Sequence, residues 1–211
     1  METKLSLVNH LLGTVGERSV STLNTGHPSV VQAINALESH DRDFQARGWW
    51  FNTNRNVTLV QNNRGEVLIP PETLEFSITS DRLAGSTPED KQRYVKRGSR
   101  IYDSVLNTYE IGFPLYADMV IQLPIDDLPH VAAAYLKHMA AEAFYVDDDG
   151  DMTKANKLNE RKTLAWHALK AAEMKALAVN ALDSPAAREL TYRIRSVSSP
   201  TNPMLPGGRF R

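Results

Sequence analysis

The amino-acid sequence predicts an α+β fold: a mainly α-helical bundle with an inserted antiparallel β-hairpin region and an extended C-terminal tail. Apolar residues recur every three or four positions towards both ends of the chain, which indicates amphipathic helices. Between them, short β-branched and aromatic runs alternate with turn residues, which indicates strands. The tail contains three prolines and two glycines, which excludes a helix or a central strand. We therefore assign residues 1–48 plus 125–196 to the helical bundle, 49–124 to the β-rich region and 197–211 to the tail.

Two helices are expected before residue 49. The first ends at Gly16, and its apolar stripe consists of Leu5, Val8, Leu12 and Val15. The second begins near Pro28, because proline fits a first helical turn, and ends at Gly48, because glycine adopts the left-handed conformation that closes helices. Its apolar side consists of Val30, Ala33, Ile34, Leu37 and Phe44, and its other positions include Asp41, Arg42, Asp43 and Arg47.

The β-rich region is expected to contain two hairpins and one further strand. Residues 57–60 and 66–69 flank a turn at 62–65, where Asn and Gly tolerate the positive φ of tight turns. Residues 94–96 and 100–102 flank a similar turn at 97–99. A strand covers 119–123 before Pro124, and the polar, turn-rich stretch 81–92 is expected to be an exposed loop.

The last zone is rich in alanine and is expected to be helical. Asp126, Asp127 and Pro129 supply an N-terminal cap and an early proline. The stripe of this helix is Leu128, Val131, Ala132, Tyr135, Leu136, Met139 and Ala143. A second helix runs from Met152 to about Leu182, and its small residues Ala165, Ala168, Ala172 and Ala176 would let a neighbouring helix approach closely. A short helix is expected after Pro185.

Charge and cysteine content narrow the function. The chain has 24 Lys and Arg against 25 Asp and Glu, so it lacks the basic excess that sequence-independent DNA binding requires. It contains no cysteine, which removes disulfides and thiolate metal ligands. Its N-terminus lacks the pattern of a signal peptide and no apolar run is long enough to span a bilayer, so we expect synthesis in the cytoplasm and no membrane association.

No motif indicates catalysis, a cofactor or a metal. The cluster Asp147, Asp148, Asp149 and Asp151 departs from an EF-hand loop, because its glycine comes fourth instead of sixth and Leu158 stands at position twelve. We interpret it as a solvated acidic turn between helices, with a looser cation site as the alternative. The six histidines show no short metal-ligand spacing, and the hydrolase-elbow, P-loop and dinucleotide fingerprints are absent. A carboxylate pair for glycan cleavage stays open, since any two of the 25 acids could meet in space.

The segment QARGWWFN places Trp49, Trp50 and Phe51 where the second helix ends. Neighbouring side chains of an extended chain face opposite ways, so one tryptophan is expected to enter the local core and the other to meet a second surface. We interpret the three residues as a structural anchor or a subunit interface, and a stacking platform for carbohydrate or bases is the alternative. The chain end, residues 209–211, is open between a docking peptide and a frayed terminus.

Several short sequence motifs, in order, resemble those of a known family. They are LVN at 7–9 with Leu12, GE at 16–17 with VSTL at 20–23, QARGW with FN within 45–52, and VKRG at 95–98 with YD at 102–103. In order and spacing they resemble the tail tubular protein A family, the head-to-tail adaptors of short-tailed phages of the T-odd type. The resemblance covers most of residues 5–145, and the remaining part agrees in helical character and length.

The resemblance implies a structural virion protein with no enzymatic activity and no cofactor. It implies twelve copies in a ring between the portal protein and the tail nozzle protein, tail tubular protein B, with DNA passing through and not bound specifically. The tail would then order on the portal through Met204, Leu205 and Phe210, with Arg209 and Arg211 at the rim of the groove. The acidic turn would repel phosphate if it faced the lumen. Two other interpretations stay open: a tail-associated glycan or peptidoglycan hydrolase, and a cytoplasmic helical interaction module.

Overall fold

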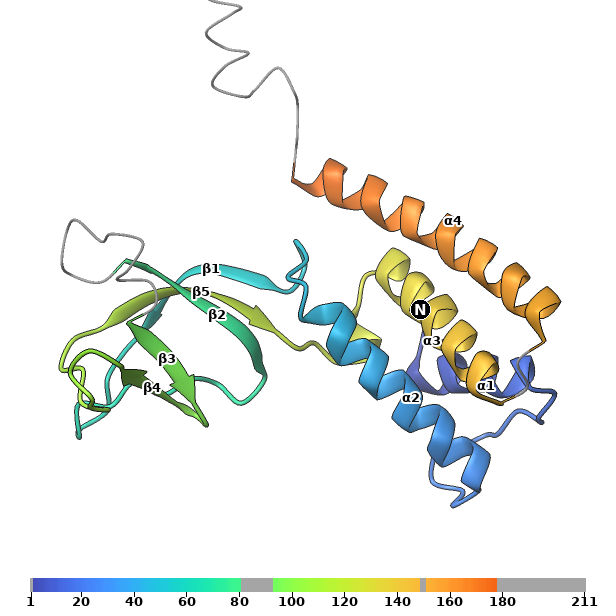
Figure 1. Ribbon diagram of the computed structural model, residues 1–211, viewed down its shortest axis with the longest axis horizontal. Helices are drawn as coiled ribbons and strands as arrows, with labels where there is room; N and C mark the ends of the chain where they lie inside the picture. The colour runs from blue at the N-terminus through green and yellow to red at the C-terminus, as the bar shows by residue number, and fades with distance from the viewer. Residues whose placement is uncertain (1, 81–92, 149–150, 178–211) are drawn as a thin grey trace, which may run out of the picture. The chain divides into compact units, whose positions relative to one another are not determined.

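The computed structural model describes residues 2–80, 93–148 and 151–177, and it combines helices with antiparallel strands (Figure 1). The helices are α1 (Lys4–Thr14), α2 (Pro28–Gln45), α3 (His130–Asp148) and α4 (Met152–Ala176), with a 3₁₀ turn, η2, at Ile125–Asp127. The strands are β1 (Thr53–Leu59), β2 (Thr73–Ser80), β3 (Tyr94–Arg97), β4 (Arg100–Asp103) and β5 (Leu115–Ile121). The predicted α+β fold class is confirmed.

The chain divides into two units, Met1–Glu173 and Met174–Arg211. The first contains α1 to α3, the strands and nearly all of α4. Of the second, the structure describes 174–177, at the end of α4. The predicted loop at 81–92, the short helix after Pro185 and the tail lie outside the described residues. The division into a helical bundle, a β-rich region and a tail stays a prediction.

Helix α1 begins with a reciprocal cap. The Ser6 N–H donates to Thr3 Oγ1 at 3.2 Å, and the Thr3 N–H donates to Ser6 Oγ at 2.9 Å. The buried apolar residues are Leu7, Val8, Leu11 and Leu12. The predicted stripe was therefore partly wrong, since Leu5 and Val15 are half-buried. The reason is that α1 packs against both α2 and α3, so two adjacent rows of its surface are covered.

Helix α2 begins at the predicted Pro28, ends at Gln45, three residues before the predicted Gly48, and contains one unexpected buried residue. Pro28 is its first residue, and Gly48 beyond its end has φ +71°. The expected residues Val30, Ala33, Leu37 and Phe44 are buried. We placed Asp41 among the positions outside the apolar side, and that prediction was wrong, because the exposed fraction of Asp41 is 3%. It lies one turn beyond Leu37, on the same face as the core residues.

The carboxylate cap predicted for α3 acts on a different helix. Asp126 Oδ1 accepts the Lys4 N–H of α1 at 2.8 Å, whereas in the first turn of α3 the N–H groups of Ala132 and Ala133 donate to the Pro129 carbonyl. This arrangement ties the start of α1 to η2. Along α3, Ala132, Tyr135 and Leu136 of the predicted stripe are buried, while Met139 and Ala143 are half-buried.

Helix α4 buries few apolar side chains for its length. They are Ala155, Leu158 and Leu169. Within the described part of this chain, no helix covers the whole predicted alanine stripe of α4. Ala165 and Ala172 are half-buried, and Ala168 and Ala176 are exposed. Polar contacts hold the helix in addition: Lys162 forms an ion pair with Glu142, and Lys154 Nζ donates to the Thr14 carbonyl at the end of α1.

The three-stranded sheet has the order β1-β5-β2, with both pairs antiparallel. We predicted that 57–60 and 66–69 pair as the two strands of a hairpin, and this was wrong, because β1 pairs with β5. The turn itself is formed: Asn62 N–H donates to Glu66 O at 2.8 Å, and Gln61 and Val67 form an isolated bridge. Strand β2 was not predicted, and the strand expected at 119–123 begins earlier, at Leu115.

The second predicted hairpin is confirmed as β3 and β4, which turn at Gly98. Its buried side, Tyr94 and Ile101, joins Leu115, Met119 and other apolar residues in one core cluster. A second core cluster lies among the helices and includes Leu7, Leu37, Phe44, Trp49 and Leu136. The described residues therefore form one hydrophobic core among the helices and another around the sheets, with a small third cluster of Tyr145, Ala155 and Leu158 from α3 and α4.

Candidate functional site

Trp49 lies in an aromatic cluster where α2 leads into β1. Its exposed fraction is 2%, and its indole Nε1–H donates to the Phe44 carbonyl at 2.8 Å. Its ring is parallel to that of Phe51, with the centroids 6.4 Å apart. Trp50 is half-buried and meets Trp49 edge-on at 6.3 Å. Because the indole of Trp49 is buried and its N–H has a partner, this ring is part of the core and is not available as a stacking platform.

Helix α4 adds an indole and a lysine to the aromatic cluster. Trp166 lies 5.7 Å from Trp49 and 5.2 Å from Tyr135, measured between ring centroids. Lys170 Nζ stands over both indoles, 4.8 Å from Trp49 and 4.9 Å from Trp166. A cation held over two indole faces is attracted by both rings. Sequence reasoning missed Trp166 and Lys170, although their spacing of one helical turn from each other is a weak signal.

A buried polar junction connects the end of α2 to the chain that leaves β5. Gln45 is fully buried, its Nε2 donates to Leu123 O at 2.8 Å, and its Oε1 accepts the Leu123 N–H at 2.8 Å. Asn52 is also buried; its Nδ2 donates to Gln45 O at 2.9 Å and its Oδ1 accepts the Trp49 N–H at 2.8 Å. The Ile121 N–H donates to Asn52 O at 2.9 Å. Side-chain amides thus satisfy backbone groups that no strand pairs here.

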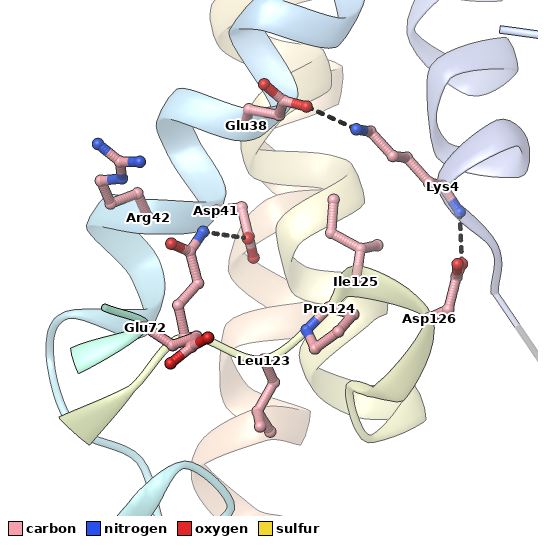
Figure 2. A pocket seen from close by; sticks show the side chains of 10 residues that line it. Lys4, Glu38, Asp41, Arg42, Glu72, Leu123, Pro124, Ile125 and Asp126 are labelled. Carbon is pink, nitrogen blue, oxygen red and sulfur yellow. Dashed lines mark hydrogen bonds and ion pairs between the residues drawn. The ribbon is translucent and has the colours of Figure 1, made fainter. Parts of the chain in front are cut away.

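An open hollow of about 460 Å³ lies beside this junction, between α2, the start of α1 and the chain from β5 to η2 (Figure 2). It is lined by Lys4, Glu38, Asp41, Arg42, Glu72, Gln122, Leu123, Pro124, Ile125 and Asp126. The size is in the range of small-molecule sites. The lining holds carboxylates and cations but no hydroxyl, thiol or imidazole, so it offers no Ser–His or Cys–His pair.

The charged groups of the hollow make structural contacts. Lys4 Nζ forms an ion pair with Glu38 at 2.5 Å, and Figure 2 shows this pair beside the Lys4–Asp126 hydrogen bond. Burial raises the pKa of Asp41, and hydrogen bonds from Gln45 and Gln122 partly oppose that shift. These contacts link α1, α2 and η2, and we assign the hollow a structural role.

A second hollow, also about 460 Å³, lies between the end of α1 and α4. It is lined by Asn9, His10, Gly13, Thr14, Lys154, Lys157, Leu158 and Arg161. Its cations face the last turn of α1, where helix carbonyls favour positive charge. His10 packs edge-on against His138 at 5.6 Å. Burial lowers the pKa of both imidazoles; the next cause is Lys137 for His10 and the neighbouring His10 for His138. The neutral form of each imidazole is therefore favoured, and the two half-buried rings pack against each other.

The described residues contain no group of three His, Asp or Glu side chains arranged to hold a metal ion. No described helix is long and apolar enough to cross a membrane. In the acidic turn, Asp147 is exposed at the end of α3, and Asp151 Oδ1 accepts the Thr153 N–H at 2.9 Å at the start of α4. The Asp148 side chain, Asp149 and the tail residues Met204, Leu205, Arg209, Phe210 and Arg211 lie outside the described part of the chain.

Comparison with known proteins identifies a family. The family described as tail tubular protein matches this chain over residues 5–179. A protein of Klebsiella phage KP34 named tail tubular protein A is 28% identical over 159 residues, which cover 74% of this chain and 80% of that protein.

Proposed function

The chain belongs to the tail tubular protein family, and on that premise we propose that it is the head-to-tail adaptor, whose copies form a ring between the portal protein and the nozzle. Its family is one of structural virion components of phage tails, not of enzymes. We infer a ring of twelve copies, assembled from chains made in the host cytoplasm, through which DNA passes unbound. Tail tubular protein B is the proposed nozzle partner.

The family match over residues 5–179 is the observation that carries this proposal, because it spans the helices and both sheets and not a single motif. Near-zero net charge suits a conduit that does not retain passing DNA.

Three regions have proposed roles in the assembly. The tail, residues 197–211, docks in a groove of the portal through Met204, Leu205 and Phe210, with Arg209 and Arg211 at the rim. The acidic turn, Asp147, Asp148, Asp149 and Asp151, faces the lumen and repels phosphate. The half-buried edges of Trp50 and Phe51 contact a neighbouring subunit.

The ring is tested by mixing the purified chain with portal protein and measuring the mass and symmetry of the product by mass photometry and electron microscopy. We expect a ring of twelve copies on the portal. A portal that gains no added mass, or a ring that forms away from the portal vertex in complete particles, would contradict the adaptor function.

Docking by the tail is tested separately. Deleting residues 197–211 should abolish portal binding and leave the circular dichroism spectrum unchanged. Phe210→Ala should weaken binding about tenfold or more, since aromatic anchors dominate interface energies. Ser198→Ala, in the same segment but outside the proposed docking residues, is the matched control. Full binding by the deletion variant would refute tail docking and leave the ring itself untouched.

A further inference from the structure

The outward side of the β3–β4 hairpin carries an ordered row of tyrosines and arginines. Residues that pair across the hairpin share a face: Val95 with Tyr102, and Arg97 with Arg100. The opposite face is buried through Tyr94, Ile101 and Asp103. Leu68 bridges to Arg100 and Tyr109 follows the hairpin. We name the set Leu68, Val95, Arg97, Arg100, Tyr102 and Tyr109 the Tyr–Arg face.

The side chains of this face order one another. The Arg97 guanidinium lies 3.6 Å from the Tyr102 ring centroid, and Arg100 lies 4.3 Å from that of Tyr109. The two tyrosine rings meet edge-on at 5.0 Å. Leu68 and Val95 beside them are exposed by 50% and 43%. Tyrosine and arginine held in place before binding lose little conformational entropy when a partner covers them, which is why both are enriched at interfaces.

The loop after β4 presents two further apolar side chains in a fixed conformation. Val105 and Leu106 are largely exposed, and their N–H groups donate to the buried Asp103 Oδ1 at 2.9 Å and 3.0 Å. Arg93 binds the other carboxylate oxygen through two N–H groups. Burial alone would raise the pKa of Asp103, but these hydrogen bonds outweigh it and lower the pKa. The charged form, which accepts the two N–H groups of the loop, is therefore favoured.

The charge of this region points to a protein partner. Arg100 forms an ion pair with Glu66 at 2.6 Å, and the backbone of Glu66 forms an isolated β-bridge with that of Glu110, so two glutamates lie beside the face that carries the two arginines. A surface for nucleic acid needs an excess of cations to displace counterions from the phosphates. Counted together with these two glutamates, the two arginines of the Tyr–Arg face give no net positive charge, and exposed aliphatic residues lie beside them.

The same chain carries a second exposed face of matching character on α4. Glu160, Leu164, Ala168 and Ala171 follow one another at steps of three or four residues, and all four are exposed. Alanine side chains project little from a helix, so the flat rings of a partner could approach α4 closely beside Leu164. Glu160 forms no ion pair with a described residue, and neither does Arg97 of the Tyr–Arg face.

We propose that the Tyr–Arg face of one copy packs against the Glu160–Ala171 face of α4 on the next copy. A closed ring uses heterologous contacts, in which each chain supplies two different complementary surfaces, and these two faces meet that requirement. The charges of the two faces also match. Arg97 on one face and Glu160 on the other form no ion pair with a described residue of their own chain, so each is free to pair with the other across the contact. This inference rests on the proposed ring and identifies one of its contacts.

The absence of cysteine in the chain allows a direct test by cross-linking. Chains with Val95→Cys and chains with Ala168→Cys are mixed, assembled on portal protein and treated with a short bifunctional maleimide. We expect a covalent dimer that contains both variants. Val31→Cys, on α2 with an exposed fraction of 46% close to the 43% of Val95, is the matched control and should cross-link to Ala168→Cys at least tenfold less.

Charge reversal gives an independent readout. Arg97→Glu and Glu160→Arg should each lower the yield of rings about tenfold, and the double variant should restore it, because the reversed pair attracts again. Circular dichroism is measured on each variant to check that it is folded. Rings that form normally from both single variants, a double variant without recovery, or cross-links from Val95→Cys to portal protein instead would overturn the inference. If the wild-type chain forms no ring on the portal, the proposed function fails instead.

Discussion

Replacing Gln45 with alanine should destabilise the fold far more than a single hydrogen bond would suggest. The change leaves three groups without their partner: the N–H and the C=O of Leu123, and Oδ1 of Asp41. An orphaned polar group costs about 1–3 kcal/mol, with charged groups near the upper limit. Leu123 is half-buried, so water recovers part of the loss there, whereas Asp41 is 3% exposed. About 1 kcal/mol for each Leu123 group and about 2 for Asp41 give a loss of about 4 kcal/mol.

The loss is measured by urea denaturation followed by circular dichroism, at constant temperature and pH 7. A loss of about 4 kcal/mol corresponds to a fall in Tm of about 10 °C for a chain of this size. Gln122→Ala is the matched control, because Gln122 is half-buried and makes one long bond, at 3.3 Å, to Asp41. We expect it to cost under about 1 kcal/mol. Equal effects of the two alanine variants, or a loss below about 1 kcal/mol for Gln45→Ala, would refute the junction as a source of stability.

Three further changes have expected outcomes. Trp49→Ala should cost about 3–5 kcal/mol in urea denaturation, because it empties a core site, and the half-buried Trp50→Ala should cost clearly less; equal costs would contradict the different packing of the two rings. Burial raises the pKa of Asp41 above its unfolded value, so the folded state favours the protonated carboxyl. The stabilisation from this proton is fully present below the unfolded pKa, and it is lost as the pH rises through the folded pKa. Asp41→Asn should therefore be more stable than the wild type at pH 7 and lose that advantage in acid, measured as Tm against pH; a constant difference would exclude this titration. Gly48→Ala should cost about 1–2 kcal/mol or more, because φ is +71° and a Cβ would lie 3.1 Å from Val120 Cγ2; an unchanged urea midpoint would show that the chain adapts there.

The family and the helices could be predicted from local sequence. The motifs within residues 5–145 identified the tail tubular proteins, and the family match over 5–179 confirms that assignment. Pro28 marks the start of α2 and the left-handed Gly48 follows its end by three residues, since each acts through the backbone preferences of its own residue. The β3–β4 hairpin was predicted for the same reason, because its turn and its two strands are adjacent in the chain.

Strand pairing across long separations could not be predicted in this way. The turn at 62–65 is present, yet β1 pairs with β5, some sixty residues away in sequence, and β5 also pairs with β2. Local propensity is the same whichever partner a strand finds, so side-chain patterns do not choose between them. The Tyr–Arg face depends on this tertiary arrangement, since Leu68 and Tyr109 join the hairpin only through contacts outside it.

The sequence by itself determined the fold class, the family and the absence of thiol chemistry, because each depends on residue identity and short spacing. The tertiary structure decided which polar residues are buried and which apolar residues are exposed. Asp41 looked like a solvent-facing position and lies in the core, whereas Ala168 looked like a packing position and is exposed. A periodic pattern marks one face of a helix, but the neighbours that cover this face are set by distant parts of the chain, and burial follows from those neighbours.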